Sequence, residues 1–339
     1  MSSEVLELLR EQARLLFERH CTRATIEEAE AGTWPAALWA AIEEAGLPDV
    51  LLPEDRGGSG GGLREAVAIL RAQGAAAAPV PLAETMLGRW LLKRAGPGVV
   101  SLGFIGEPVA IGRSPAGDPG AGIEMAWAAA ADACVLVSEA TGELHIASRG
   151  AITVVRMRRS PAGEPRELIV ANSSKGVGKA PPGASPLALL SLFRAAQISG
   201  ALTQVLEITL RYAKERTQFG RTISNFQAIQ QMLAEAAGHA AAAGVAVDIA
   251  AASASETTCA SAKARAGEAA GRVAATAHQI LGALGYTREY HLHTLTRRLW
   301  SWRDEAGDDV FWQARLAQHA FANGAANELW AYVTAQTDG

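Results

Sequence analysis

A short polar break between two helical patterns carries the side chains best suited to bind a phosphate group. The segment Arg216–Thr222 holds two arginines, an amide, a hydroxyl and an aromatic ring, and we name it the elbow. A guanidinium forms a planar fork that matches phosphate oxygens, so a phosphate-bearing cofactor is one expected ligand. The alternatives are a partner chain, a solvated connection between helices, or a surface ion pair of Arg216 with Glu207 or Glu215.

A run of acids near the end of the chain is the second candidate for chemistry. Asp304, Glu305, Asp308 and Asp309 lie among three tryptophans, Trp300, Trp302 and Trp312. Aromatic walls remove water from a carboxylate and raise its pKa, which makes it a better general base. The alternatives are that the acids cap the last helix and that the tryptophans pack in the core.

Two helices must position the elbow. Apolar residues recur at helical spacing before it, from Val205 to Ala213, and after it, from Phe226 to Leu233. Gly220 is expected to end the first helix, and Ser224 or Asn225 to cap the second.

The whole chain divides into three stretches of different character. Residues 1–97 are predicted to be helical, residues 98–182 to form a small antiparallel β-domain, and residues 183–339 to form a helical bundle of four long helices. The fold class is therefore α+β, mostly α. The runs that favour strands are Val99–Ile105, Ala133–Val137, Leu144–Ile146, Ile152–Met157 and Leu168–Val170.

Composition excludes several classes of function. The net charge of −4 provides no basic surface for nucleic acid. Three scattered cysteines favour reduced thiols in the cytoplasm, and together with His291 and His293 they show no metal-ligand spacing. The acidic N-terminus is unlike a signal peptide, and no strongly apolar run reaches the roughly 18 residues of a membrane span, so membrane insertion is not expected.

Four segments resemble the acyl-CoA dehydrogenase family. The elbow and its flanks, Tyr212–Gln230, are similar to the flavin-contacting segment of that family, and Leu51–Gly58, His278–Tyr290 and the segment through Arg298 are similar in the same order. The middle of the chain resembles the family least. It lacks the threonine-serine-glycine strand and the tryptophan-threonine pair that hold the flavin ring, because Ala128 follows Trp127, so Trp127 is expected in the core.

The resemblance implies a cofactor and partners. It implies FAD, an acyl-CoA substrate, an electron-transfer flavoprotein, and a dimer or tetramer of like or related subunits. It also implies that certain residues grip the adenosine-diphosphate portion of the flavin, partly across a subunit interface. The matching positions here are Arg216, Gln218, Phe219, Gln227, Gln279, Gly282 and Ala283, where Ala283 replaces a glycine of the family.

The catalytic base is displaced from its usual position. The family glutamate aligns with Ala306, so Glu305 is the first candidate and Asp304 the second, and the alternative position in the family is Leu190 here. The implied activity is flavin-dependent α,β-dehydrogenation of an acyl-CoA thioester. One alternative is a non-catalytic subunit that completes the flavin site of a partner acting on bulky or steroid side-chain acyl-CoAs. Another is a flavin-free CoA-binding or scaffold protein.

Overall fold

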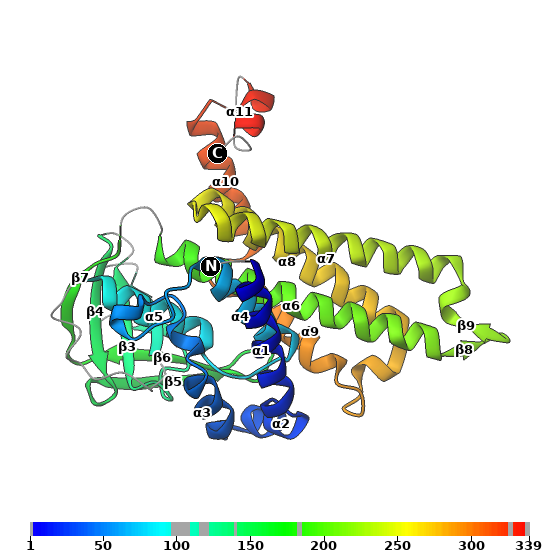
Figure 1. Ribbon diagram of the computed structural model, residues 1–339, viewed down its shortest axis with the longest axis horizontal. Helices are drawn as coiled ribbons and strands as arrows, with labels where there is room; N and C mark the ends of the chain where they lie inside the picture. Colours follow the sequence, from blue (N-terminus) through cyan, green and yellow to red (C-terminus); the bar gives the residue numbers. More distant parts are fainter. Residues whose placement is uncertain are drawn as a thin grey trace.

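The computed structural model describes residues 3–95, 109–114, 122–138, 141–181, 185–324 and 328–335. Figure 1 shows a β-sheet at one end, long helices running to the other end, and N-terminal helices packed beside both. The expected strand at 99–105 lies outside the described residues. The proposed boundaries at 97/98 and 182/183 also border undescribed residues and stay a prediction.

The N-terminal part consists of α-helices and two short 3₁₀ turns. Their apolar residues, including Leu38, Ile42, Leu70 and Met86, are buried in one core shared with the bundle. In order the elements are α1 (Ser3–His20), α2 (Arg23–Ala31), α3 (Ala36–Glu44), η1 (Leu47–Asp49), η2 (Glu54–Arg56), α4 (Leu63–Ala75) and α5 (Leu82–Ala95).

Within the described residues, seven strands form one sheet in the order β5-β6-β2-β1-β3-β4-β7. The strictly antiparallel prediction is wrong in one respect: β1 and β3 pair in parallel, with Val109 opposite Ala133. The reason is that β2 pairs on one side of β1 and the chain then crosses to its other side. The strands are β1 (Val109–Ser114), β2 (Ile123–Ala126), β3 (Ala133–Ser138), β4 (Glu143–Ser148), β5 (Ile152–Arg159), β6 (Pro165–Ala171) and β7 (Lys175–Lys179).

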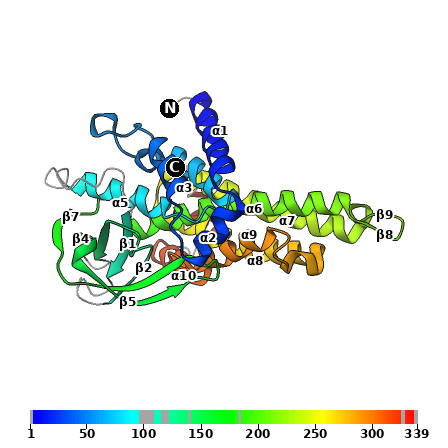
Figure 2. The ribbon, with the colours of Figure 1, turned by 90° about the horizontal axis from the view of Figure 1, so that it is seen from below.

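Four helices form the bundle, as Figure 2 shows from below. They are α6 (Pro186–Glu215), α7 (Gln227–Ser253), α8 (Glu256–Leu281) and the shorter α9 (Leu292–Asp304). The last predicted helix is two helices, α10 (Asp309–Ala322) and α11 (Leu329–Ala335), with residues 325–327 between them undescribed. Since α10 leans on α8 and then extends away from the body, α9 takes the fourth position (Figure 1).

The N-terminal helices meet the bundle where α4 crosses α6 at two glycines. A Cβ on Gly74 would lie 2.0 Å from the carbonyl oxygen of Gln197, and one on Gly200 would lie 1.9 Å from that of Arg71. Both distances are far inside van der Waals contact, so this crossing requires glycine at both positions.

Two bundle helices, α6 and α7, are long and apolar enough to cross a membrane by length and composition, contrary to the expectation from sequence. The apolar window of α6 is 78% buried inside the protein, and that of α7 is 28% buried. Burial explains α6 as a core helix, and it leaves one face of α7 uncovered.

Candidate functional site

The elbow folds as a two-residue β-hairpin at the far tip of the bundle. Strands β8 (Thr217–Gln218) and β9 (Arg221–Thr222) pair around Phe219 and Gly220, whose φ angles are +51° and +79°. Helix α6 ends before this turn, with Arg216 as its C-cap. Gly220 therefore serves the hairpin turn and not the helix end, which corrects the expectation from sequence. The predicted caps Ser224 and Asn225 lie in η5 (Ile223–Asn225), and the N-cap of α7 is Phe226, with no side-chain hydrogen bond.

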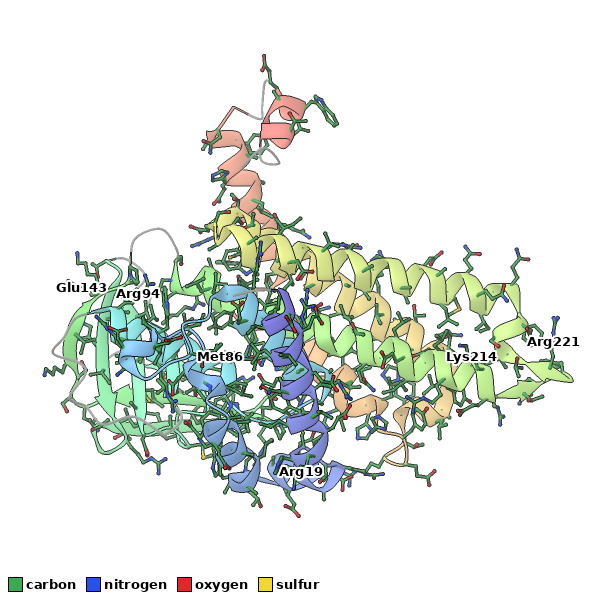
Figure 3. All side chains as sticks on the ribbon, viewed as in Figure 1. Arg19, Met86, Arg94, Glu143, Lys214 and Arg221 are labelled. Carbon is green, nitrogen blue, oxygen red and sulfur yellow. The ribbon has the colours of Figure 1, made fainter. Side chains whose placement is uncertain are left out.

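The side chains of the elbow are presented to solvent. Phe219 is 91% exposed, and within the described part of the chain Arg216 makes no ion pair with Glu207 or Glu215. Arg221 lies over the Phe226 ring at 4.2 Å, and Phe219 meets that ring edge-on at 6.2 Å. Figure 3 shows Arg221 at the projecting hairpin beyond Lys214. The elbow thus offers donors and an aromatic face to a second molecule.

The second predicted flavin-gripping group lies at the same end of the bundle. Gln279 is exposed on the last turn of α8, and Gly282 and Ala283 are exposed in η6 (Gly282–Tyr286). Tyr290, which follows this segment, stacks edge-on against Tyr212 of α6 at 6.3 Å. This contact joins the segment after α8 to the helix that carries the elbow. Gln227 is exposed at the start of α7, directly after the elbow.

Glu305, the first candidate base, lies in a buried cluster of charges between the three parts of the chain. Arg166 of β6 donates a hydrogen bond to its Oε1, and Nε of Arg194 of α6 lies 2.8 Å from its Oε2. Arg194 also forms an ion pair with Glu84 of α5, and Arg166 with Glu164. Both oxygens of Glu305 are therefore engaged by cations. We name Glu84, Glu164, Arg166, Arg194 and Glu305 the ion cluster.

The electrostatics of Glu305 are opposite to those expected for a general base. Burial acts to raise the pKa of its carboxyl, but the positive charges of Arg166 and Arg194 outweigh burial and hold that pKa below its ordinary value. The expected rise in pKa is therefore wrong for Glu305. Its role as a base stays a prediction, which this geometry does not favour.

A buried lysine fixes the backbone on both sides of Glu305. Lys263 of α8 is fully buried, and its Nζ donates to the carbonyl oxygens of Arg303, at 2.5 Å, and Gly307, at 2.7 Å. Burial lowers the pKa of Lys263 to about 8. The lysine clamps the turn between α9 and α10, and so holds Glu305 against its arginines.

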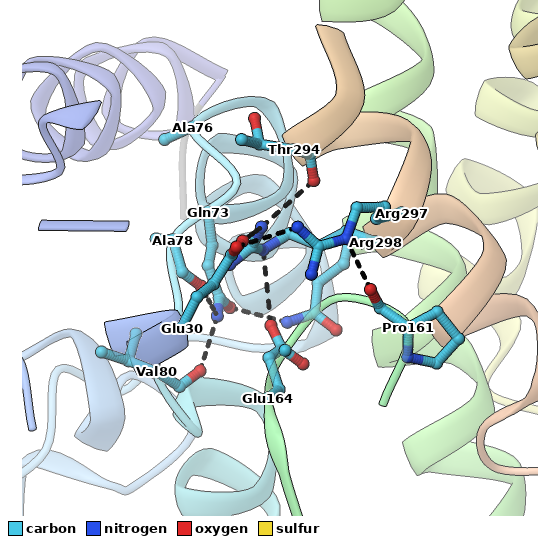
Figure 4. Close-up of polar contacts among 12 residues, drawn as sticks. Glu30, Gln73, Ala76, Ala78, Val80, Pro161, Glu164, Thr294, Arg297 and Arg298 are labelled. Carbon is cyan, nitrogen blue, oxygen red and sulfur yellow. Dashed lines mark hydrogen bonds and ion pairs between the residues drawn. The ribbon is translucent and has the colours of Figure 1, made fainter. Parts of the chain in front are cut away.

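The ion pairs continue toward the N-terminal helices. Arg298 of α9 is fully buried and reaches Glu30 of α2 at 3.2 Å and Glu164 at 3.4 Å. Arg297 pairs with Glu30 at 2.9 Å and donates to the carbonyl oxygen of Pro161 (Figure 4). Charges from helix, sheet and bundle thus meet at one junction, where each has a partner of opposite sign.

Asp304 and Asp308, two other members of the acidic run, form an ion pair and a helix cap. Asp304 is 63% exposed and forms an ion pair with the adjacent Arg303. Asp308 is the N-cap of α10 and accepts from Phe311 N at 2.7 Å, so the capping alternative is confirmed for this residue. Trp302 and Trp312 are buried, and Trp312 donates to the carbonyl oxygen of Ala306.

Trp127 of the β-domain packs against this chain's own aromatic residues. Trp127 is 5% exposed and packs edge-on against Trp34 at 5.8 Å, and Trp34 in turn contacts Trp39. The prediction that Trp127 lies in the core is confirmed. The exposed donors and the aromatic ring of the elbow are compatible with the adenosine-diphosphate portion of a flavin, and Trp127 also borders a cavity of about 650 Å³.

Sequence reasoning missed Arg166, Arg194 and Lys263. One signal was present: Arg194 interrupts an apolar helical run, and a buried arginine requires a carboxylate partner. Its partners are far away in sequence, however, and nothing local identifies them. Within the described residues, no group of three histidine, cysteine or acidic side chains could hold a metal ion.

Comparisons with known proteins agree with this arrangement. The acyl-CoA dehydrogenase N-terminal domain matches residues 3–98, and the acyl-CoA dehydrogenase C-terminal domain matches residues 187–309. The acyl-CoA dehydrogenase IpdE2 of Mycobacterium tuberculosis is 30% identical over 87% of this chain and 91% of its own length.

Solved structures of the same fold include two that are described as pairs of proteins. A steroid dehydrogenase variant, Tcur3481-Tcur3483, covers 96% of this chain and 99% of its own at 24% identity and a TM-score of 0.79. The ChsE4-ChsE5 complex from Mycobacterium tuberculosis covers 95% and 98% at 22% identity and a TM-score of 0.82. The chain belongs to the acyl-CoA dehydrogenase family of flavin-dependent oxidoreductases.

Proposed function

We propose that this chain acts in FAD-dependent α,β-dehydrogenation of an acyl-CoA thioester as the subunit that completes the flavin site of a related partner. In this reaction a carboxylate removes the α-proton, and the bound flavin accepts the β-hydride. The partner would supply the base and the surroundings of the flavin ring. Electrons would pass to an electron-transfer flavoprotein.

The state of Glu305 carries this proposal. A general base needs a lone pair that faces the substrate and a pKa near the working pH. Arg166 and Arg194 engage both oxygens of Glu305 and lower the pKa of its carboxyl. The carboxylate is therefore a weaker base, and neither oxygen is free to accept a proton from a substrate. Asp304 is exposed and paired with Arg303, so it does not replace Glu305.

The elbow is the part of this chain that we propose contacts the flavin. An exposed phenylalanine in a strained left-handed conformation has no benefit for the stability of an isolated chain. Such strain is typical of sites that contact a ligand or a partner. The adenine of FAD can stack on Phe219, while Arg216 and Gln218 donate to the diphosphate.

One surface favours a related chain as the partner. Val245 and Ile249 on the open face of α7 are 58% and 54% exposed, and the exposed small residues Gly238, Ala241 and Ala252 follow on the same side of the helix. An apolar helix face of this kind suits association with another bundle. The pairs of proteins named in two structures of the same fold support this choice.

The flavin content of purified protein tests the proposal. Expressed alone, the chain should carry no flavin, and co-expressed with an acyl-CoA dehydrogenase chain from the same source it should form a yellow complex. Phe219→Ala and Arg216→Gln should lower the flavin content of that complex without dissociating it. Arg156→Gln, which changes an exposed arginine of β5, is the matched control. A chain that is fully loaded with FAD by itself contradicts the proposal.

The second candidate function is an autonomous dehydrogenase in which Glu305 is the base. It is favoured by one observation: Glu305 is the acid closest in sequence to the family position, and its side chain is only 18% exposed. For this function Arg166 and Arg194 would have to release the carboxylate when substrate binds. Substitution of Glu305 separates the two candidates, as described at the end of the Discussion.

A further inference from the structure

A groove on the N-terminal side of the bundle has no part in the proposed reaction. It lies between α1, α4, α6 and the start of α9, and its volume is about 840 Å³. This volume falls in the range of small-molecule sites. None of the elbow or ion cluster residues lines it.

Small side chains create this groove. The glycine crossing of α4 and α6 brings the two backbones into contact, and α1 packs across α4 beside it. The helix surfaces that face the resulting corner carry Ala68, Ala72 and Ala76, which are too short to fill it. Phe17 closes the floor as an apolar wall.

The rim of the groove is cationic although the chain as a whole is acidic. Four arginines line it (Arg10, Arg14, Arg23 and Arg71), against two glutamates, Glu18 and Glu207, while the net charge of the chain is −4. Their partners Glu7, Glu11 and Glu27 do not line the groove, whereas Glu18, which pairs with Arg14, does. Exposed pairs of this kind are weak, so an entering anion can compete for the arginines.

Arg71 is the best placed of the four. Its Nη1 contacts Asp248 at 2.8 Å and its Nη2 donates to the carbonyl oxygen of Gly244 at 2.7 Å, so the guanidinium is held in place by α7. Its Nε is buried and has no hydrogen-bond partner. Because that atom is covered, an anion in the groove reaches the charge of Arg71 through the partly exposed outer nitrogens, where it competes with the exposed Asp248.

We propose that this groove binds an amphiphilic anion, with its apolar body on the alanine floor and its carboxylate or phosphate at Arg14 and Arg71. The positive charge of the arginines favours an anionic head group. The small alanine side chains on α4 leave room for an apolar body. The site is separate from the proposed function and does not depend on it.

Titration calorimetry of the full chain with dodecanoate tests this inference. Saturable binding of one molecule per chain is expected. Arg14→Gln and Arg71→Gln should each weaken it about tenfold, as expected for the loss of one charge-assisted hydrogen bond. Ala72→Leu, which fills the floor, should abolish binding without loss of the folded state in a thermal melt. Arg156→Gln is the control and should leave the affinity unchanged.

Two further probes identify the ligand class. Dodecanol should bind at least about tenfold more weakly than dodecanoate, and inorganic phosphate alone should not bind. Equal affinity for dodecanol, unchanged affinity in both arginine variants, or no binding of dodecanoate would overturn the inference. Association only with phosphatidylglycerol vesicles would also overturn it, because that result indicates a membrane-facing surface.

Discussion

At the scale of single residues, Glu305 shows how neighbours decide the work of a carboxylate. Two arginines hold it as an anion, and the lysine clamp fixes the turn that carries it. The same residue type in an apolar pocket without cations would have a raised pKa and could accept a proton. The ion cluster therefore favours the anionic form of Glu305.

We expect Glu305→Gln to destabilise the protein by roughly 3 kcal/mol, because the buried Arg166 and Arg194 each lose one of two carboxylate partners and keep only Glu164 and Glu84. Asp304→Asn is the matched control, since Asp304 is 63% exposed and its pair with Arg303 contributes little. Urea unfolding of both variants measures the difference. Equal stabilities would show that the buried pairs contribute nothing net.

The contribution of Glu305 should also depend on pH. Its folded pKa lies below the ordinary value of 4.5, so the stability it provides is fully present above that value. It is lost as pH falls through the lowered folded pKa. The difference in unfolding free energy between wild type and Glu305→Gln should therefore shrink as pH decreases below 4.5. A difference that grows on acidification would indicate a raised pKa, as a base requires.

At the scale of elements, the crossing of α4 and α6 depends on the absence of two side chains. Gly200→Ala should destabilise the protein by more than about 2 kcal/mol, because the new methyl overlaps the backbone of α4. Gly238→Ala on α7 has no atom within 4 Å of the new Cβ, and it should stabilise by roughly 0.5–1 kcal/mol through helix propensity. Thermal and denaturant unfolding of both variants measure the change in unfolding free energy, and so compare steric overlap at Gly200 with helix propensity at Gly238. Stabilisation by both substitutions would mean that the helices do not cross this closely.

The sequence predicts helices and strands well where the spacing of apolar residues determines them. It predicts them poorly where contacts between distant residues determine the structure. The helices on both sides of the elbow followed from apolar spacing. The hairpin between them did not, because a phenylalanine with positive φ is rare and has no local signal. The contact of Arg166 with Glu305 joins residues 139 positions apart, which no local pattern can indicate.

At the scale of the molecule, the elbow and the open face of α7 expose apolar side chains, as do Phe321 of α10 and Trp330 of α11 among the described residues. Association through α7 should be driven by burial of apolar area. Val245→Glu combined with Ile249→Lys should therefore release free subunits in size-exclusion chromatography at unchanged helix content. Val155→Lys, on the exposed side of β5, is a control that should leave the assembly intact. Persistence of the assembly in the double variant would place the interface elsewhere.

The central claim is that this chain helps to hold the flavin but does not supply the base. The most direct measurement is the bleaching of flavin absorbance on adding acyl-CoA, under anaerobic conditions, to the assembled enzyme that carries Glu305→Gln in this chain. Glu305→Gln combined with Arg166→Gln provides a second variant, in which one arginine is removed together with its carboxylate partner. We predict bleaching at the wild-type rate in every assembly that retains flavin. Retention of flavin with loss of bleaching in both variants would contradict the account and assign the base to Glu305.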